Sequence, residues 1–175
     1  MKKNILFVLS LFLVVNCFAQ EGKESKKERE TGTSVYYLIR HAEKDRSDKS
    51  NKNPDLTKQG HNRAEYWASV FKKVPFDAVY STNYNRTKQT AKPTAKAHEL
   101  EIKTYNPFGI KMDDFLKETK GQTVLIVGHS NTTPNFVNRL IQRENYEPIK
   151  DDNNGNLYIV TISGDSKTVQ LLTVN

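Results

Sequence analysis

The chain has 175 residues, the size of one domain with short appendages, and a formal net charge of +7. The basic excess suits anionic ligands, although such lysines are as often part of a solvated surface. One cysteine excludes an internal disulfide, so a buried core must hold the domain together. No aromatic platform stands among basic residues, so no nucleic-acid partner is expected.

Residues 1–19 have the layout of a secretory signal peptide, with two early lysines, an apolar stretch at 5–15 and small residues towards Ala19. That stretch is short for a membrane span, so no stable membrane insertion is expected after cleavage. Cleavage after Ala19 predicts an exported, periplasmic or secreted protein. The alternative is a lipoprotein acylated at Cys17, which Asn16 disfavours because such sites usually have a small residue there.

Residues 20–33 are almost wholly charged or polar and predict a disordered tether. From residue 34 to residue 175 strand and helix patterns alternate, which indicates one domain. Its first half is predicted to contain a strand at 35–39, a polar loop at 41–56, a helix at 56–74 with Thr57 as N-cap, and a strand at 77–81.

The second half of the domain continues the alternation. It is predicted to contain a helix at 85–100 in which Pro93 marks a kink or a new first turn, a weak strand at 101–105, a helix at 112–120, a strand at 123–128, a helix at 132–143 capped by Thr132 or Thr133, and a hairpin of strands 156–162 and 167–174. This order predicts a three-layer α/β/α sandwich with a mostly parallel central sheet.

Ionisable residues follow three of the predicted strands. Arg40 and His41 end the first strand, Arg86 follows the second, and His129 follows the strand at 123–128. Ligands of such sheets bind beyond the carboxyl ends of the strands. If these strands are neighbours, the two histidines and two arginines converge there.

Such a cluster suits phosphoryl chemistry. Two arginines form a permanent multi-donor site for phosphate or carboxylate, and they lower the pKa of a nearby histidine. A neutral imidazole can attack phosphorus if its other nitrogen donates to a backbone carbonyl. Two histidines could instead hold a metal, but neighbouring arginines repel a cation, so neither a metal nor another cofactor is expected.

Four segments carry a family resemblance. LIRHAEK (38–44), LTKQGHNRA (56–64), YSTNYNRTKQTAKPTA (80–95) and VLIVGHS (124–130) stand in the order and on the elements of the histidine phosphatase superfamily. The chain resembles that superfamily, with its phosphoglycerate mutase-like fold, over essentially all of residues 34–175. It looks most like the small bacterial phosphohistidine-type phosphatases.

The resemblance implies a role for each matching residue. His41 would be the nucleophile that becomes phosphohistidine, Arg40, Arg86 and His129 would form the phosphate pocket, the backbone N–H of Ser130 would add a donor, and Asn53 would make a loop contact to phosphate. No metal or organic cofactor is implied.

The proton donor departs from the family pattern. Many members place a glutamate shortly after the third strand, where this chain has only Asp113 and Asp114 nearby. Glu43 is the other carboxylate close to His41 in the sequence, and Ser130 stands where the acid phosphatase branch has an aspartate. The donor is therefore Glu43, Asp113, Asp114 or none of them, and good leaving groups such as phosphohistidine need no strong acid.

The expected function is an exported phosphatase that hydrolyses phosphorylated small molecules, phosphomonoesters or related compounds, through a phosphohistidine intermediate. One alternative is a catalytically weak or inactive phosphate-binding module of the same fold. Another is a cell-envelope enzyme that removes phosphate from lipopolysaccharide sugars. The sequence specifies neither the physiological substrate nor the oligomeric state.

Overall fold

The computed structural model describes residues 32–174. The predicted signal peptide at 1–19, including Cys17, and all but the last two residues of the predicted tether at 20–33 lie outside the described residues. Within residues 32–174, no helix is long and apolar enough to cross a membrane.

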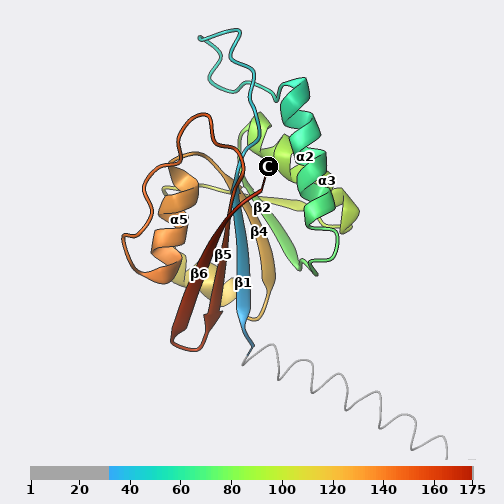
Figure 1. The fold of residues 1–175 in the computed structure, drawn as a ribbon. Coiled ribbons are helices and arrows are strands. Elements are labelled where there is room, and N and C mark those ends of the chain that lie inside the picture. Colours follow the sequence, from blue (N-terminus) through green and yellow to red (C-terminus); the bar gives the residue numbers. More distant parts are fainter. Residues whose placement is uncertain (1–31, 175) are drawn as a thin grey trace, which may run out of the picture.

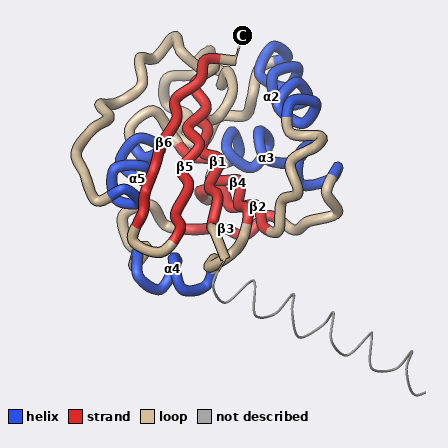
Figure 2. Tube along the Cα trace, turned by 60° about the horizontal axis from the view of Figure 1, so that its bottom comes forward, coloured by secondary structure: helices blue, strands red, loops and turns tan. Residues whose placement is uncertain are grey.

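The core of the fold is one six-stranded sheet with the order β3-β2-β4-β1-β5-β6 (Figure 2). The strands are β1 (Ser34–Arg40), β2 (Ala78–Thr82), β3 (Ile102–Tyr105), β4 (Thr123–Gly128), β5 (Asn156–Ser163) and β6 (Ser166–Thr173). The first four are parallel, β5 runs antiparallel to β1, and β6 runs antiparallel to β5. The β5–β6 hairpin turns at Gly164, whose positive φ of 56° favours glycine.

Helices cover both faces of the sheet (Figure 1). They are α2 (Lys58–Val70) and α3 (Asn85–Ala97) on one face, and α4 (Met112–Glu118) and α5 (Thr132–Ile141) on the other. Successive β1 residues point to opposite faces, so Leu38 packs in the cluster of Phe136 while Ile39 packs in the cluster of Trp67. The prediction of an α/β sandwich with a mostly parallel central sheet is confirmed.

The local predictions hold better for element type than for helix ends. Thr57 caps α2, since its side chain accepts a hydrogen bond from the Gly60 N–H. α3 continues past Pro93 as one helix. The cap predicted for α5 was wrong: Asn131 is the N-cap residue, because the Thr132 hydroxyl instead accepts the His129 N–H at 2.9 Å.

Sheet topology brings three strand ends together. β4 lies between β1 and β2, with Arg40 level with Gly128 and Ser81 level with Val127. The residue after β4, His129, is therefore placed between the ends of β1 and β2. The loops at 41–57 and 142–155 project from this same end of the molecule (Figure 1).

Candidate active site

His41 is buried in a form suited to nucleophilic attack. Its side chain directly follows β1 and the residue is 4% exposed. Nδ1–H donates to the Ala42 carbonyl at 2.7 Å, so Nε2 carries the lone pair. Burial is the largest cause that lowers the pKa of His41 to about 3, and the charges of Arg40 and Arg86 lower it further. The imidazole is therefore uncharged at neutral pH.

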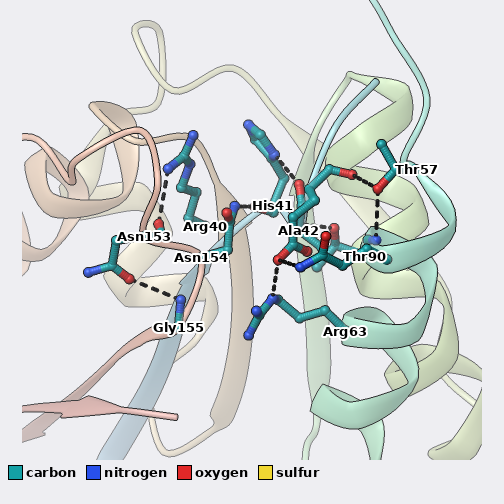
Figure 3. A network of polar contacts seen from close by, with 12 residues as sticks. Arg40, His41, Ala42, Thr57, Arg63, Thr90, Asn153, Asn154 and Gly155 are labelled. Carbon is teal, nitrogen blue, oxygen red and sulfur yellow. Dashed lines mark hydrogen bonds and ion pairs between the residues drawn. The ribbon is translucent and has the colours of Figure 1, made fainter. Parts of the chain in front are cut away.

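The peptide group between His41 and Ala42 is hydrogen-bonded at both its N–H and its carbonyl (Figure 3). The Ala42 N–H donates to the Thr90 hydroxyl of α3 at 2.9 Å, and that hydroxyl donates to the Arg86 carbonyl at 2.7 Å. From the loop before β5, the Asn154 side chain donates to the His41 carbonyl at 2.8 Å. The ring that Ala42 orients is thus held by two distant segments of the chain.

The LTKQGHNRA segment supports the chain just after His41. The Thr57 N–H donates to the Glu43 carbonyl at 2.9 Å, and Arg63 Nε donates to the Glu43 carboxylate at 2.8 Å. Gly60 lies so close to Glu43 that a Cβ at residue 60 would collide with the Glu43 carbonyl oxygen. These residues therefore position residue 43 and, through it, the turn that follows His41.

Gly60→Ala is expected to lower the free energy of unfolding by about 1–3 kcal/mol, because the added methyl group overpacks against the Glu43 backbone. Helix propensity alone predicts the opposite sign, a gain of up to about 1 kcal/mol. Urea unfolding measures the difference, with the exposed Asn62→Ala on the same helix as the control. A more stable Gly60→Ala protein would contradict the close contact.

His129 lies beside His41, with ring centroids 5.5 Å apart. The Thr82 hydroxyl donates to Thr87, so it accepts the Nε2–H of His129 at 2.9 Å. Nδ1 then carries the lone pair and accepts from Arg86 Nη2 at 3.3 Å. Burial and then the charge of Arg86 lower the pKa of His129 to about 4. Both histidines are thus neutral at neutral pH while the arginines stay charged.

The two arginines have buried donors that lack a protein acceptor. Among the residues the structure describes, Arg40 Nε and Arg86 Nε and Nη1 are buried with no hydrogen-bond partner. Each unsatisfied buried donor costs about 1–3 kcal/mol, and more where the group is charged. The rest of the Arg40 guanidinium is held by loop carbonyls and by Asp151 Oδ1, the latter at 2.7 Å. An oxyanion between the arginines would satisfy the open donors.

A pocket of about 360 Å³ opens above these groups, and we call it the catalytic pocket. Of the predicted site residues, it is lined by Arg40, His41, Arg86, His129 and Ser130. Sequence reasoning missed four other lining residues that matter here, namely Lys44, Tyr84, Phe108 and Asp151. Lys44 and Tyr84 stand inside the segments that carry the resemblance, so that signal could have found them. Asp151 had no such signal.

The Tyr84 ring contacts two side chains of the catalytic pocket, Arg86 in the first turn of α3 and His129 after β4. The Arg86 guanidinium lies 4.5 Å from the centroid of the Tyr84 ring, a cation–π contact. The same ring meets the His129 ring edge to face at 5.0 Å between centroids. Tyr84 therefore fixes Arg86 against His129.

The remaining residues that the sequence singled out do not line the catalytic pocket. The Glu43 carboxylate pairs with Arg63 of α2 and does not line the catalytic pocket. Asp113 and Asp114 are exposed in the first turn of α4 and do not line it either. Asn53 accepts the Asn85 N–H at 2.8 Å and thereby supports the start of α3.

Asp151 is the one carboxylate among the described residues that lines the catalytic pocket. It accepts from Arg46 and from Arg40, each at 2.7 Å. These hydrogen bonds, first from Arg46 and then from Arg40, lower the pKa of Asp151. The carboxylate is therefore ionised at neutral pH and unsuited to donate a proton to a leaving group.

Metal binding was the rival chemistry for paired histidines. In the part of the chain that the structure describes, no group of three or more His, Cys, Asp or Glu side chains is placed to hold a metal ion. The groups around the two histidines are instead Arg40, Arg86 and Lys44, which suit an anion.

Known proteins of this shape include phosphatases. The chain superposes on the protein histidine phosphatase SixA complexed with tungstate with a TM-score of 0.65 and 18% identity over 79% of this chain and 96% of that one. For phosphoglycerate mutase from Bacillus anthracis the TM-score is 0.64, with 13% identity over 83% and 95%. For a phosphoserine phosphatase mutant from Entamoeba histolytica with bound phosphoserine it is 0.61, with 15% identity over 78% and 95%. No curated protein sequence matches the chain significantly.

Likeness at such low identity establishes the fold alone, and a sequence model adds a family match over part of the chain. The model of the histidine phosphatase superfamily (branch 1) matches residues 36–108, the part of the chain that contains Arg40, His41 and Arg86. Together with the phosphatases among the structural neighbours, this match supports phosphatase activity. Residues 36–108 of the chain therefore resemble the histidine phosphatase superfamily (branch 1).

Proposed function

We propose that the protein is an exported phosphatase that hydrolyses phosphomonoesters or related phosphorylated small molecules through a phosphohistidine at His41. The observation that carries this proposal is an uncharged, buried imidazole beside buried arginine N–H groups that have no protein acceptor. The family supports it, as does SixA, whose structure holds tungstate, an oxyanion. Export is supported by the signal-peptide pattern of residues 1–19, with acylation at Cys17 as the alternative.

In the first step, the phosphoryl oxygens accept hydrogen bonds from Arg40 and Arg86, which aligns phosphorus with Nε2 of His41. The Nε2 lone pair forms the N–P bond, and the bond from phosphorus to the leaving group breaks with its electron pair on that group. The imidazole becomes cationic as it is phosphorylated. The bond from Nδ1–H to the Ala42 carbonyl strengthens in that state and stabilises the intermediate.

His129 changes role when the phosphoryl group is bound. Its Nδ1 accepts from Arg86 in the empty site. A dianion beside the ring raises the pKa of His129, since an opposite charge favours the imidazolium. Protonation at Nδ1 then turns the ring into a donor to a phosphoryl oxygen. In the second step water attacks phosphorus, the N–P bond breaks with its electron pair on Nε2 of His41, and a proton of the water passes to the released phosphate or to solvent.

The ionised state of Asp151 bears on the choice of substrate. A group held ionised by two arginines cannot protonate a departing alkoxide. Substrates whose leaving groups depart without strong acid, such as phosphoramidates, acyl phosphates and aryl phosphates, fit this pocket best. The lack of a proton donor is also what favours the second candidate, a phosphate-binding module without turnover.

Purified protein is expected to hydrolyse p-nitrophenyl phosphate in EDTA, because no step uses a metal. The kcat/KM, corrected for ionisation of the ester, should persist from about pH 8 to about pH 5. The nucleophilic form of His41 exists above its pKa, so activity is lost only as the pH falls towards about 3. An ordinary histidine would give an acid limb near 6.5.

Two outcomes would contradict this proposal. One is an absence of turnover for p-nitrophenyl phosphate and for several other phosphate esters between about pH 4 and pH 8. The other is a corrected acid limb centred near 6.5, which would require a solvated histidine rather than buried His41.

A further inference from the structure

A second hollow, of about 340 Å³, adjoins the catalytic pocket, and we call it the side pocket. The two share Phe108, Asn131 and Thr132 as lining residues. The side pocket is otherwise walled by the first turns of α5 and by the loop at 144–148. A ligand whose phosphoryl group lies at His41 can therefore extend across the shared residues into the side pocket.

Phe108, which lines both pockets, is an exposed aromatic side chain on a turn that hydrogen bonds hold in place. Phe108 is 84% exposed. Its N–H donates to the Asn106 side chain at 3.0 Å, and the Ile110 N–H donates to the Asn106 carbonyl at 3.0 Å. Arg139 of α5 donates to the Ile110 carbonyl at 2.7 Å. The fold thus holds a large apolar group in solvent at the rim of both pockets, where it can contact a ligand.

The loop at 144–148, which forms another part of the side-pocket lining, is held in place by hydrogen bonds. Asn138 of α5 is 4% exposed, and its Oδ1 accepts the N–H groups of Asn145 at 3.1 Å and Tyr146 at 3.0 Å. Its Nδ2 donates to the Glu144 carboxylate at 3.2 Å. The loop is also tied to the catalytic pocket, because the Ile149 N–H donates to the Ser130 carbonyl at 2.8 Å. The side pocket is therefore a built feature rather than a gap between mobile loops.

The two pockets have opposite charge. Lys44, Arg40 and Arg86 line the catalytic pocket together with Asp151. Within the described residues, the charged groups that line the side pocket are Glu144 and Glu147, with no lysine or arginine. Aromatic and proline carbons from Phe108, Tyr146, Pro134 and Pro148 make up much of the remaining wall. Phosphate favours the first pocket, and an apolar group that ends in a cation favours the second.

We propose that the side pocket binds the leaving group of the substrate and selects leaving groups that combine a flat or apolar body with a positive charge. The substrate class is then phosphate esters or phosphoramidates of cationic compounds. This inference rests on the proposed phosphatase function, because it assumes that the phosphoryl group binds at His41. Phe108 and Tyr146 contact the apolar body, and Glu144 and Glu147 face the charge.

The test compares two aryl phosphates of similar size, para-(aminomethyl)phenyl phosphate and para-(carboxymethyl)phenyl phosphate, with p-nitrophenyl phosphate as the reference for activity. The wild-type kcat/KM is expected to be about tenfold or more higher for the cationic ester, mainly through KM. In the double variant Glu144→Gln, Glu147→Gln this ratio should fall by about tenfold. Comparing ratios between proteins cancels the intrinsic reactivity of the two esters.

The matched control is Glu65→Gln, Glu101→Gln, which removes the same charge at exposed positions that do not line either pocket and should keep the wild-type ratio. If the double variant unfolds, Glu147→Gln alone should lower the ratio by about threefold, since the Asn138 contacts to the loop remain.

The inference is overturned if the wild-type ratio of kcat/KM, cationic ester over anionic ester, is one or less. It is also overturned if this ratio is unchanged in Glu144→Gln, Glu147→Gln. In either case, turnover of p-nitrophenyl phosphate would still support the proposed function. If the wild type hydrolyses none of the three esters, the proposed function fails and the inference falls with it.

Discussion

His41→Ala is expected to lower kcat on p-nitrophenyl phosphate by at least about 1,000-fold, because the variant lacks the nitrogen that forms the proposed covalent intermediate. The His41 ring is oriented by the bond from Nδ1–H to the Ala42 carbonyl, and a water molecule in its place would lack this fixed alignment. Steady-state kinetics measure the loss. In the wild type, rapid quenching with an isotopically labelled ester should trap phosphate on the protein, and the variant should trap none.

Binding measurements complete this test. The arginine donors remain in His41→Ala, so vanadate or inorganic phosphate should still bind within about tenfold of the wild-type affinity. The control is His61→Ala, an exposed histidine on α2, which should keep wild-type kcat. Turnover retained in His41→Ala would remove the covalent mechanism. Binding of vanadate by both proteins with turnover in neither would establish the phosphate-binding module instead.

Arg86→Lys is expected to lower kcat/KM by about 100-fold or more although the charge is kept, because lysine has no planar fork of donors. Arg86 reaches His129 with Nη2 at 3.3 Å and has Nε and Nη1 left for an oxyanion. Its guanidinium also lies over Tyr84, which a lysine ammonium would contact differently. The inhibition constant for inorganic phosphate should rise together with the loss of kcat/KM.

The matched control is Arg143→Lys, at an exposed arginine that lines neither pocket. It should keep kcat/KM and phosphate inhibition at wild-type values. A kcat/KM for Arg86→Lys within about threefold of the wild type would mean that only net charge matters at this position. The buried, unpartnered donors of Arg86 would then have no role in binding phosphate.

The sequence alone determined the order and type of the elements, because these depend on patterns within a few residues of one another. Short continuous apolar runs at 35–39 and 123–128 indicated buried strands, and Thr57 indicated the start of α2. The strand-edge rule then placed His41, Arg86 and His129 at one end of the sheet. The helices end two to four residues earlier than the patterns suggested, since helix-like spacing can continue beyond the last helical hydrogen bond.

Only the tertiary structure decided in which direction each polar side chain points and which residues from distant parts of the sequence line the catalytic pocket. Glu43 follows His41 by two residues yet pairs with Arg63 of α2, whereas Asp151, 111 residues from Arg40, lines the catalytic pocket. The side pocket likewise joins the turn at Phe108 to the loop at 144–148 through Asn138 and Arg139. The spacing of residues along the sequence does not predict these long-range contacts, because they depend on how the helices pack on the sheet and on the paths of the loops between them.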